Sequence, residues 1–235
     1  MHNGHAKTYV LSLGGSLIIP NGGFDTEFLS KFNTFIREKI NAGMRFFITC
    51  GGGTTARKYI DAATAVLGNE IKDIDKDWLG IHSTRLNAHL IKTLFRDLAY
   101  TYMIKHYDLV DKNAKEEKLV IAGGWKPGWS TDFCATLLAE DYGIDTVINL
   151  SNINQVYDKD PRKFSDAKPI DRMSWDEIIA IVGDTWTPGL NVPFDPIAAA
   201  KAKEIGLKVI IINGNNFENF DAVLEGREFL GTVIE

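Results

Sequence analysis

Short apolar runs and longer segments of helical periodicity alternate along this chain. Residues 8–13 place tyrosine and leucine at every second position, and a glycine pair follows them. Residues 28–40 place phenylalanine, leucine and isoleucine at helical spacing. The first spacing is that of one strand face, and the second is that of one helix face. The first forty residues therefore predict a strand, a glycine loop and a helix that ends near Gly43.

The same unit recurs through the rest of the chain. A second strand at 44–50 leads into three glycines and a helix with the apolar stripe Ala56, Tyr59, Ile60, Ala63 and Leu67. Further helices are predicted at 78–98, 131–143, 174–183, 195–206 and 216–226, and further strands within 118–124, 145–150, 207–212 and 229–234. This alternation predicts an α/β fold with a mainly parallel sheet and helices on both faces. We expect a single domain over residues 1–235.

Composition and charge narrow the class of partner. The chain of 235 residues is 45% hydrophobic, which is enough for a sizeable core. Its net charge of −5 argues against nucleic acid or an anionic membrane as partner, so an anionic ligand has to be held by local geometry. The first residues carry no signal-peptide pattern, and no run of about 18 apolar residues occurs. We therefore expect neither a nucleic-acid nor a membrane partner.

Cysteine and histidine positions argue against a resident metal site. Cys50 and Cys134 are far apart and belong to no CxxC or Cys/His cluster, so neither a disulfide framework nor a structural zinc site is expected. His82 and His89 lie on one predicted helix without metal-ligand spacing. A reducing, cytoplasmic setting fits this usage best.

Three loops that follow predicted strands are rich in glycine: Gly14 to Ser16, Gly51 to Gly53, and the pair at 123–124. Ligands of open α/β sheets bind at the carboxyl ends of the strands, and glycine lets main-chain N–H groups approach an oxyanion there. Each loop alone is more often just a tight turn, but their repetition predicts a phosphate cradle. The chain has neither GxxxxGK[ST] nor GxGxxG, which excludes the standard P-loop and Rossmann motifs.

Polar residues beside these loops have two interpretations each. Arg57 lies in the first turn of the helix after the three glycines, where its guanidinium either binds phosphate oxygens or lies on the surface. Asp77 precedes a predicted helix, and it either caps that helix or accepts from a ribose hydroxyl. Ser130, Thr131 and Asp132 begin another helix, which they cap, or at which they hold an anion, or both.

Two large rings flank the loop before that helix. Trp125 and Trp129 bracket a Lys-Pro-Gly sequence, and a purely structural turn does not require such rings. They either wall a ligand site or pack at a subunit contact.

Seven segments, in order, resemble the amino-acid-kinase superfamily, and within it most of all the uridylate (UMP) kinases of the archaeal type. They cover residue 8 to the C-terminus: SLGGSL, CGGGTTARKYI, DWLGIHSTRLNA, AGGWKPGWSTDFCATLLAE, NLSNINQVYDKDPRKF, FDPIAAAKAKEIGLKVIIING and GTVI. The resemblance implies a three-layer α/β/α sandwich with an acceptor-binding half at about 1–140 and an ATP-binding half at about 141–235. It further implies transfer of the γ-phosphoryl group of ATP to UMP with Mg²⁺, and a homo-oligomer, commonly a hexamer.

The resemblance also implies roles for particular residues. On the ATP side it places Gly14, Gly15, Gly53, Arg57, Ser151, Asn152, Tyr157 and Asp160. On the UMP side it places Gly52, Asp77, Trp125, Lys126, Pro127, Gly128, Trp129, Ser130 and Thr131. The implied catalytic residues are Arg57, Asp132 and Asp195.

Some positions depart from the family pattern. Many members carry a lysine two residues before the first glycine, where this chain has Ser12. Bringing two phosphorylated anions together requires neutralisation, so we hypothesise that Arg57, Lys126 or Lys159, with Mg²⁺, supplies the positive charge. The two loop tryptophans stand where other members often have threonine and histidine. Further departures lie in the nucleotide loop: Ser151, Ile153, Asn154 and Gln155 replace the common Thr, Val, Asp and Gly.

Two alternatives to a UMP kinase remain at this point. The same fold and ATP site serve kinases with other acceptors, namely carbamate, acetylglutamate, aspartate or isopentenyl phosphate. A non-catalytic protein that stores an oxyanion or senses a nucleotide is the other alternative. Asp77 and the GWSTD segment favour a nucleotide acceptor, because a carboxylate acceptor requires more basic residues beside it.

Overall fold

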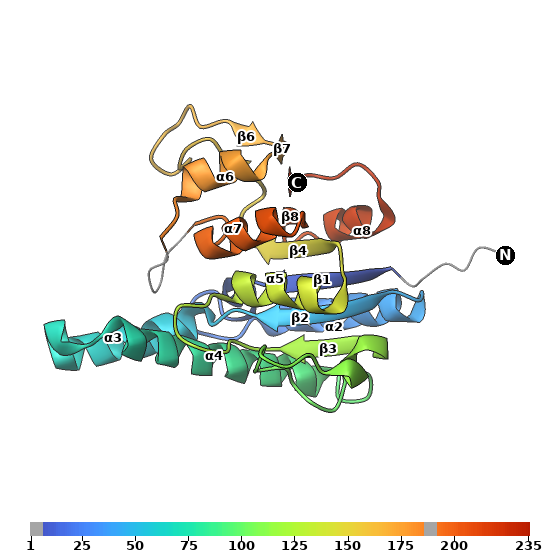
Figure 1. The fold of residues 1–235 in the computed structure, drawn as a ribbon, viewed down its shortest axis with the longest axis horizontal. Coiled ribbons are helices and arrows are strands. Elements are labelled where there is room, and N and C mark those ends of the chain that lie inside the picture. Colours follow the sequence, from blue (N-terminus) through green and yellow to red (C-terminus); the bar gives the residue numbers. More distant parts are fainter. Residues whose placement is uncertain (1–6, 186–191) are drawn as a thin grey trace.

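A seven-stranded sheet runs through the computed structural model, which describes residues 7–185 and 192–235. The strand order is β3-β2-β1-β4-β8-β9-β7 (Figure 1). Five neighbouring strands are parallel: β3 (Leu119–Ala122), β2 (Arg45–Cys50), β1 (Thr8–Leu13), β4 (Thr146–Ser151) and β8 (Lys208–Asn213). β9 (Thr232–Ile234) is antiparallel to β8, and β7 (Arg172–Met173) pairs with β9. β5 (Val156–Tyr157) and β6 (Pro169–Ile170) form a separate small hairpin.

Helices cover both faces of this sheet. One face packs against α2 (Thr26–Asn41), α4 (Asp73–Leu94) and α8 (Phe217–Glu225). The other packs against α5 (Thr131–Tyr142), α6 (Trp175–Val182) and α7 (Pro196–Glu204). The remaining helical segments are α1 (Gly15–Ile18), α3 (Gly53–Leu67) and the 3₁₀ turns η1 (Gly68–Glu70) and η2 (Lys112–Glu116). The arrangement confirms the three-layer α/β/α sandwich with a mainly parallel sheet.

The alternation of residues in β1 explains how one strand serves two cores. Leu11 and Leu13 lie in the core under α2, α4 and α8, and Val10 lies in the core under α5, α6 and α7. Ser12 points to the second face because successive side chains of a strand alternate. The helix predicted over 28–40 is α2, and all its predicted apolar positions are buried. Each such side chain contributes about 1.5–3 kcal/mol by leaving water.

The helix that carries Asp77 begins earlier than predicted. α4 starts at Asp73, so Asp77 lies in its second turn and does not cap it. The cap is made by Asp75, whose carboxylate accepts from the main-chain N–H of Lys72 at 3.2 Å. Two aspartates in the first turn stabilise this start through the helix dipole. The apolar periodicity used for the prediction is weak over this turn, and the helix also ends four residues earlier, at Leu94.

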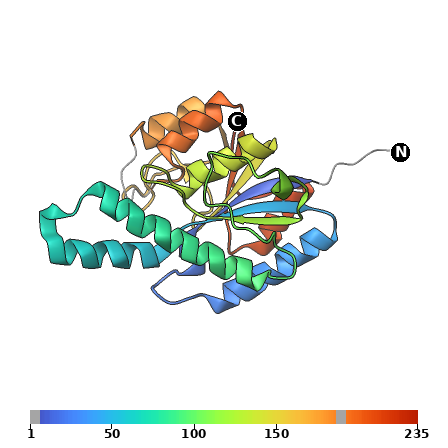
Figure 2. The same cartoon turned by 60° about the horizontal axis from the view of Figure 1, so that its bottom comes forward.

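α3 departs from its predicted role. It carries the predicted apolar stripe, yet none of its fifteen residues is buried. Tyr59 is 59% exposed, Leu67 is 46% exposed and Val66 is 84% exposed. Figures 1 and 2 show why: α3 and the start of α4 project beyond the edge of the sheet as an arm. α2 and α4 already cover the sheet on that side, so α3 packs on α4 and α1 instead.

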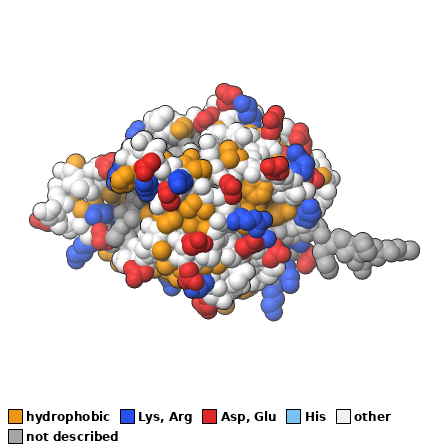
Figure 3. Space-filling view, turned by 90° about the horizontal axis from the view of Figure 1, so that it is seen from above, with side chains coloured by type: hydrophobic (Ala, Val, Ile, Leu, Met, Phe, Trp, Pro, Cys, Tyr) orange, Lys and Arg blue, Asp and Glu red, His pale blue; other side chains and the backbone are white. Residues whose placement is uncertain are grey.

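The surface agrees with the charge of the sequence. Lysine, arginine and acidic side chains are interspersed over the face seen in Figure 3, without a broad field of one sign. Among the described residues, no helix combines the length and the apolar character needed to cross a bilayer.

Candidate active site

The five parallel strands end at one edge of the sheet, and the chain changes direction there. From β1 it proceeds to β2 and β3 on one side, and β4 and β8 lie on the other side of β1. Such a switch point leaves a crevice between the loops of the two central strands. The three predicted glycine loops follow β1, β2 and β3, so the structure brings them to the same edge.

The first two glycine loops interlock main chain to main chain. The N–H of Gly14 donates to Leu150 O at 2.9 Å, and the N–H of Gly51 donates to Leu13 O at 2.8 Å. A Cβ on Gly15 would lie 2.1 Å from Gly53 N, and one on Gly53 would lie 2.3 Å from Gly15 O. Gly53 also has a φ of +62°, which favours glycine. Side chains are excluded here, so the main chains of the two loops lie in direct contact at this part of the edge.

α4 holds the glycine loops through polar side chains that the sequence analysis did not single out. Asn87 Nδ2 donates to Gly51 O at 2.7 Å. Thr84 Oγ1 accepts from Gly124 N at 2.9 Å. Arg85 Nε donates to Gly124 O at 2.9 Å, and its NH2 group donates to Trp125 O at 2.8 Å. A signal was present, because buried polar residues between the apolar positions of a helix require partners.

Asp77 and the loop at 125–131 are in direct contact. The carboxylate of Asp77 accepts from the main-chain N–H of Gly128 at 2.6 Å. Burial raises the pKa of Asp77, and the hydrogen bond from Gly128 opposes that rise. A residue of α4 thus fixes the tip of the loop predicted to bind the acceptor.

The rings of that loop form one cluster. Trp125 and Trp129 meet edge to face with centroids 4.7 Å apart, and Trp129 meets Phe133 of α5 in the same way at 4.6 Å. The ammonium of Lys126 lies 4.3 Å from the Trp125 centroid and 4.4 Å from the Trp129 centroid. Cation–π attraction of this kind holds the lysine against the loop. Pro127 links this lysine to Gly128 at the loop tip.

The first turn of α5 presents an aspartate. Ser130 caps the helix, because its Oγ accepts from Phe133 N at 3.0 Å. Asp132 Oδ1 accepts from Ser12 Oγ at 2.8 Å and from Asn149 Nδ2 at 3.0 Å. Burial raises the pKa of Asp132 to about 6, the Ser12 and Asn149 hydrogen bonds lower it, and the charge of Asp195 raises it. Capping is therefore confirmed for Ser130, while Thr131 is the first residue of α5.

Asp195 lies beside Asp132 at the start of another helix. It is 3% exposed, and its Oδ1 caps α7 by accepting from Ala198 N at 2.6 Å. Its Oδ2 has no hydrogen-bond partner among the described residues. Burial raises the pKa of Asp195. Two carboxyl groups thus share one region of the site, with Asp195 influencing the charge state of Asp132.

The segment predicted to contact ATP leaves the end of β4. Ser151 is the last residue of β4, and its carbonyl accepts from Gly214 N at 2.9 Å. Asn152 is exposed and Tyr157, on β5, is partly buried. The carboxylate of Asp160 is engaged by the Arg162 guanidinium, with Nε to Oδ1 at 3.0 Å. The structure therefore places the first two positions at the strand edge, and it turns Asp160 toward its own hairpin.

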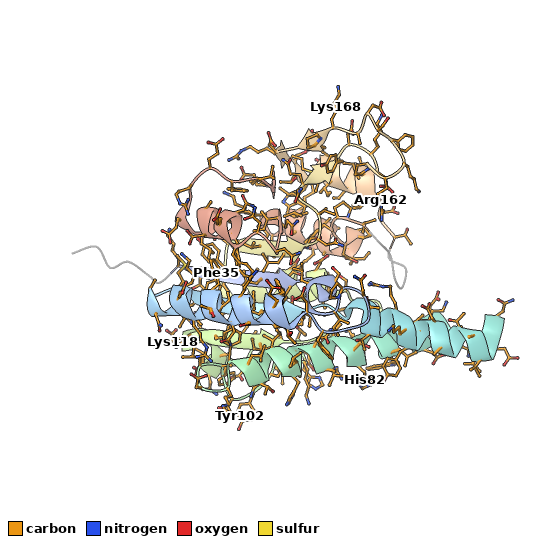
Figure 4. All side chains as sticks on the ribbon, turned by 180° about the vertical axis from the view of Figure 1, so that it is seen from behind. Phe35, His82, Tyr102, Lys118, Arg162 and Lys168 are labelled. Carbon is orange, nitrogen blue, oxygen red and sulfur yellow. The ribbon has the colours of Figure 1, made fainter. Side chains whose placement is uncertain are left out.

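The three basic candidates differ in their contacts. Arg57 is exposed and donates to Thr54 Oγ1 at 2.9 Å. Lys159 is paired with Asp166 at 2.6 Å, and Lys126 lies over the two tryptophans. Within residues 7–185 and 192–235, Arg57 is the candidate that has neither an acidic nor an aromatic partner. His82, also considered from the sequence, is exposed on the outer side of α4 (Figure 4).

The sequence matches the model of the amino acid kinase family over residues 7–213, and the chain belongs to that family. The curated proteins that resemble this chain have a more specific name, uridylate kinase. The uridylate kinase of Pyrococcus abyssi is 34% identical over 227 residues, which cover 96% of this chain and 98% of that protein. The uridylate kinase of Methanospirillum hungatei JF-1 is 33% identical over 228 residues, which cover 97% of this chain and 94% of that protein.

Solved structures agree with this membership. The uridylate kinase of Archaeoglobus fulgidus superposes with a TM-score of 0.80 at 33% identity, over 97% of this chain and 99% of that one. The UMP kinase of Ureaplasma parvum superposes with a TM-score of 0.78 at 19% identity, over 98% of this chain and 99% of that one. The second match supports the fold alone.

Proposed function

We propose that this protein is an ATP-dependent UMP kinase, which transfers the γ-phosphoryl group of ATP to UMP and releases UDP and ADP. The observation that carries the proposal is the meeting, at one sheet edge, of two interlocked glycine loops, the Asp77-bound loop and Asp132. The relatives that match over nearly the full length are named uridylate kinases, and this name indicates UMP as the acceptor. Phosphoryl transfer needs positioning and charge stabilisation more than a nucleophilic side chain, and the interlocked loops at this edge are suited to positioning.

We assign the two substrates to opposite sides of the switch point. The half at about 1–140 binds UMP through Gly52, Asp77 and the loop at 125–131. The half at about 141–235 binds the adenosine of ATP through Ser151, Asn152, Tyr157 and Asp160, with Gly14, Gly15 and Gly53 at its phosphates. The contacts that tie Asp77 to Gly128 and α4 to the glycine loops support this division.

Mg²⁺ enters this scheme with ATP. In the described part of the chain, no group of three or more His, Cys, Asp or Glu side chains forms a site for a resident metal ion. We assign MgATP as the co-substrate, in which the ion neutralises phosphate charge during transfer. Asp132 and Asp195 order charged groups near the transferred phosphoryl.

Arg57 is the strongest candidate for the additional positive charge. Ser12 occupies the position at which a lysine was expected, and its hydroxyl binds Asp132 instead of a phosphate. Lys126 and Lys159 already have partners. A guanidinium binds phosphate oxygens in a bidentate manner, and Arg57 stands near the start of α3, beside the second glycine loop.

A homo-oligomer, commonly a hexamer in the family that the sequence resembles, is part of the proposal. Five large apolar side chains of the projecting arm remain 39–84% exposed: Tyr59, Val66, Leu67, Ile74 and Trp78. A second copy of this chain is the occupant that we assign to this face. The two free cysteines are buried, which suits the cytoplasm as the site of the reaction.

Steady-state ADP formation with MgATP tests the function. The acceptor panel is UMP, CMP, dTMP, carbamate, acetylglutamate, aspartate and isopentenyl phosphate, each assayed at equal concentration. We expect turnover with UMP to exceed that with every other acceptor. Preferred turnover of another acceptor would refute the UMP assignment, and ATP binding without turnover of any acceptor would refute catalysis itself.

A further inference from the structure

A buried polar row crosses three neighbouring strands beneath the first turn of α5. Thr49 on β2, Ser12 on β1 and Asn149 on β4 share one register, because Ser12 pairs with both of the others. They are 0%, 4% and 6% exposed, respectively. The residues two positions before them on the same face belong to the apolar core. Buried polar groups cost free energy unless they form hydrogen bonds, so the contacts of this row identify its role.

Two members of the row converge on Asp132. Ser12 Oγ and Asn149 Nδ2 donate to the same carboxylate oxygen, Oδ1, at 2.8 and 3.0 Å. The third member differs, because Thr49 Oγ1 donates at 3.4 Å to the carbonyls of Leu11 and Thr131. Donors from two strands on one oxygen fix the orientation of a short side chain, and bonds to a charged acceptor are the stronger kind.

In the described part of the chain, the groups that face Asp132 are neutral or acidic. The strands face it with the neutral Ser12 and Asn149, and Cys134 follows on its own helix. Asp195, the N-cap of α7, acts in two ways: its carboxylate raises the pKa of Asp132, and its main-chain N–H lowers it. No lysine or arginine is among the groups that shift its pKa. The ordering of this carboxylate therefore rests on neutral donors, at the β1 position where a lysine was expected.

We propose that Ser12 and Asn149 are positioning residues for the phosphoryl transfer, which hold the Asp132 carboxylate in one orientation through its Oδ1. The inference rests on the proposed function and deepens it. Both residues act through Asp132 and neither has to touch a substrate. Asn149 was not predicted from the sequence, and Ser12 was noticed only as the absence of a lysine.

Replacement of each donor tests the proposal. Ser12→Ala deletes the hydroxyl, and Asn149→Leu replaces the amide by an aliphatic side chain with the same number of heavy atoms, so each variant removes one hydrogen bond to Asp132. Both bonds lower the pKa of Asp132, which is about 6, so each loss should raise it. A hydrogen bond to a charged group contributes about 1.5 kcal/mol or more, which corresponds to a pKa rise of about one unit. The acid limb of the kcat/KM profile, which reports the free enzyme, then moves to higher pH. At pH 6 the ionised fraction of Asp132 in the free enzyme falls about fivefold, and kcat/KM for each substrate falls with it.

Two matched variants separate positioning from burial. Thr49→Val changes the neighbouring member of the same row without touching Asp132, so we expect its acid limb to stay at the wild-type pH. Ser12→Thr retains the hydroxyl, and we expect it to restore the wild-type limb. Thermal unfolding of each variant checks that the protein is folded.

A measurement that does not depend on turnover tests this inference separately from the proposed function. The ¹³C NMR titration of the Asp132 carboxyl group reports its pKa in the free protein. An upward shift in both donor variants, with none in Thr49→Val, supports the proposal even if the wild type phosphorylates a different acceptor. Titration of Asp132 at the wild-type pH in Ser12→Ala and Asn149→Leu, or an equal shift in Thr49→Val, would overturn it.

Discussion

Removal of the Asp77 carboxylate is expected to weaken UMP binding through the loop at 125–131. Its bond to Gly128 N is short, at 2.6 Å, and involves a charged acceptor. Such bonds contribute about 1.5–3 kcal/mol, and the partial exposure of Asp77 argues for the lower end. About 1.4 kcal/mol corresponds to a tenfold change in an equilibrium constant. Asp77→Ala should therefore raise KM for UMP about tenfold.

Steady-state kinetics with each substrate varied in turn measures this effect. We expect KM for ATP to change less than twofold, because Asp77 contacts the acceptor loop and not the β4 edge. Asp77→Asn keeps an acceptor oxygen without the charge, so its KM for UMP should lie between those of the wild type and Asp77→Ala. Asp61→Ala, an exposed aspartate on α3, is the matched control. An unchanged KM for UMP in Asp77→Ala would refute the reasoning.

Tryptophan fluorescence distinguishes the loop contact from a direct contact with UMP. Trp125 and Trp129 pack on each other in this loop, so their emission reports its order. If Asp77 acts through the loop, Asp77→Ala should shift the emission of the free protein. Altered UMP binding with unaltered emission would assign the role to a substrate contact alone.

Three further changes have expected outcomes. Gly15→Ala places a Cβ 2.1 Å from Gly53 N. Overpacking of this kind costs about 1–3 kcal/mol, so Tm should fall by several degrees. Gly23→Ala is the control, because its Cβ would have no atom within 4 Å, and it should leave Tm unchanged. Arg57→Ala should lower kcat/KM at least tenfold, and wild-type values for both substrates would remove Arg57 from the catalytic set. Val66→Glu, at a side chain 84% exposed, should reduce the oligomer mass measured by light scattering, and an unchanged mass would exclude this part of the arm as an interface.

Local periodicity was sufficient for most of the fold. The buried residues of α2 are those at its predicted apolar positions, and the strand and helix alternation gave the layers. Periodicity failed where the burial of an element depends on its neighbours. The apolar stripe of α3 is typical of a helix that faces a core, yet none of its residues is buried. The helix projects from the body because α2 and α4 already cover the sheet.

The candidate site was predictable in its parts and not in its connections. Glycine after a strand marks a close main-chain approach, and the structure confirms that the Gly15 and Gly53 loops exclude side chains from each other. The contacts from Arg85 and Asn87 to these loops were missed, because they join segments more than thirty residues apart. Spacing within a helix predicts which face a residue occupies, but not what that face meets.

Sequence alone determined that Ser12 lies on the face of β1 opposite Leu11 and Leu13, since side chains alternate along a strand whatever the strand pairs with. Only the tertiary structure decided that Ser12 aligns with Asn149 and that both reach Asp132. Alternation is a local property of the backbone. Register between β1 and β4, and the seating of α5 above them, depend on packing across more than a hundred residues of intervening chain.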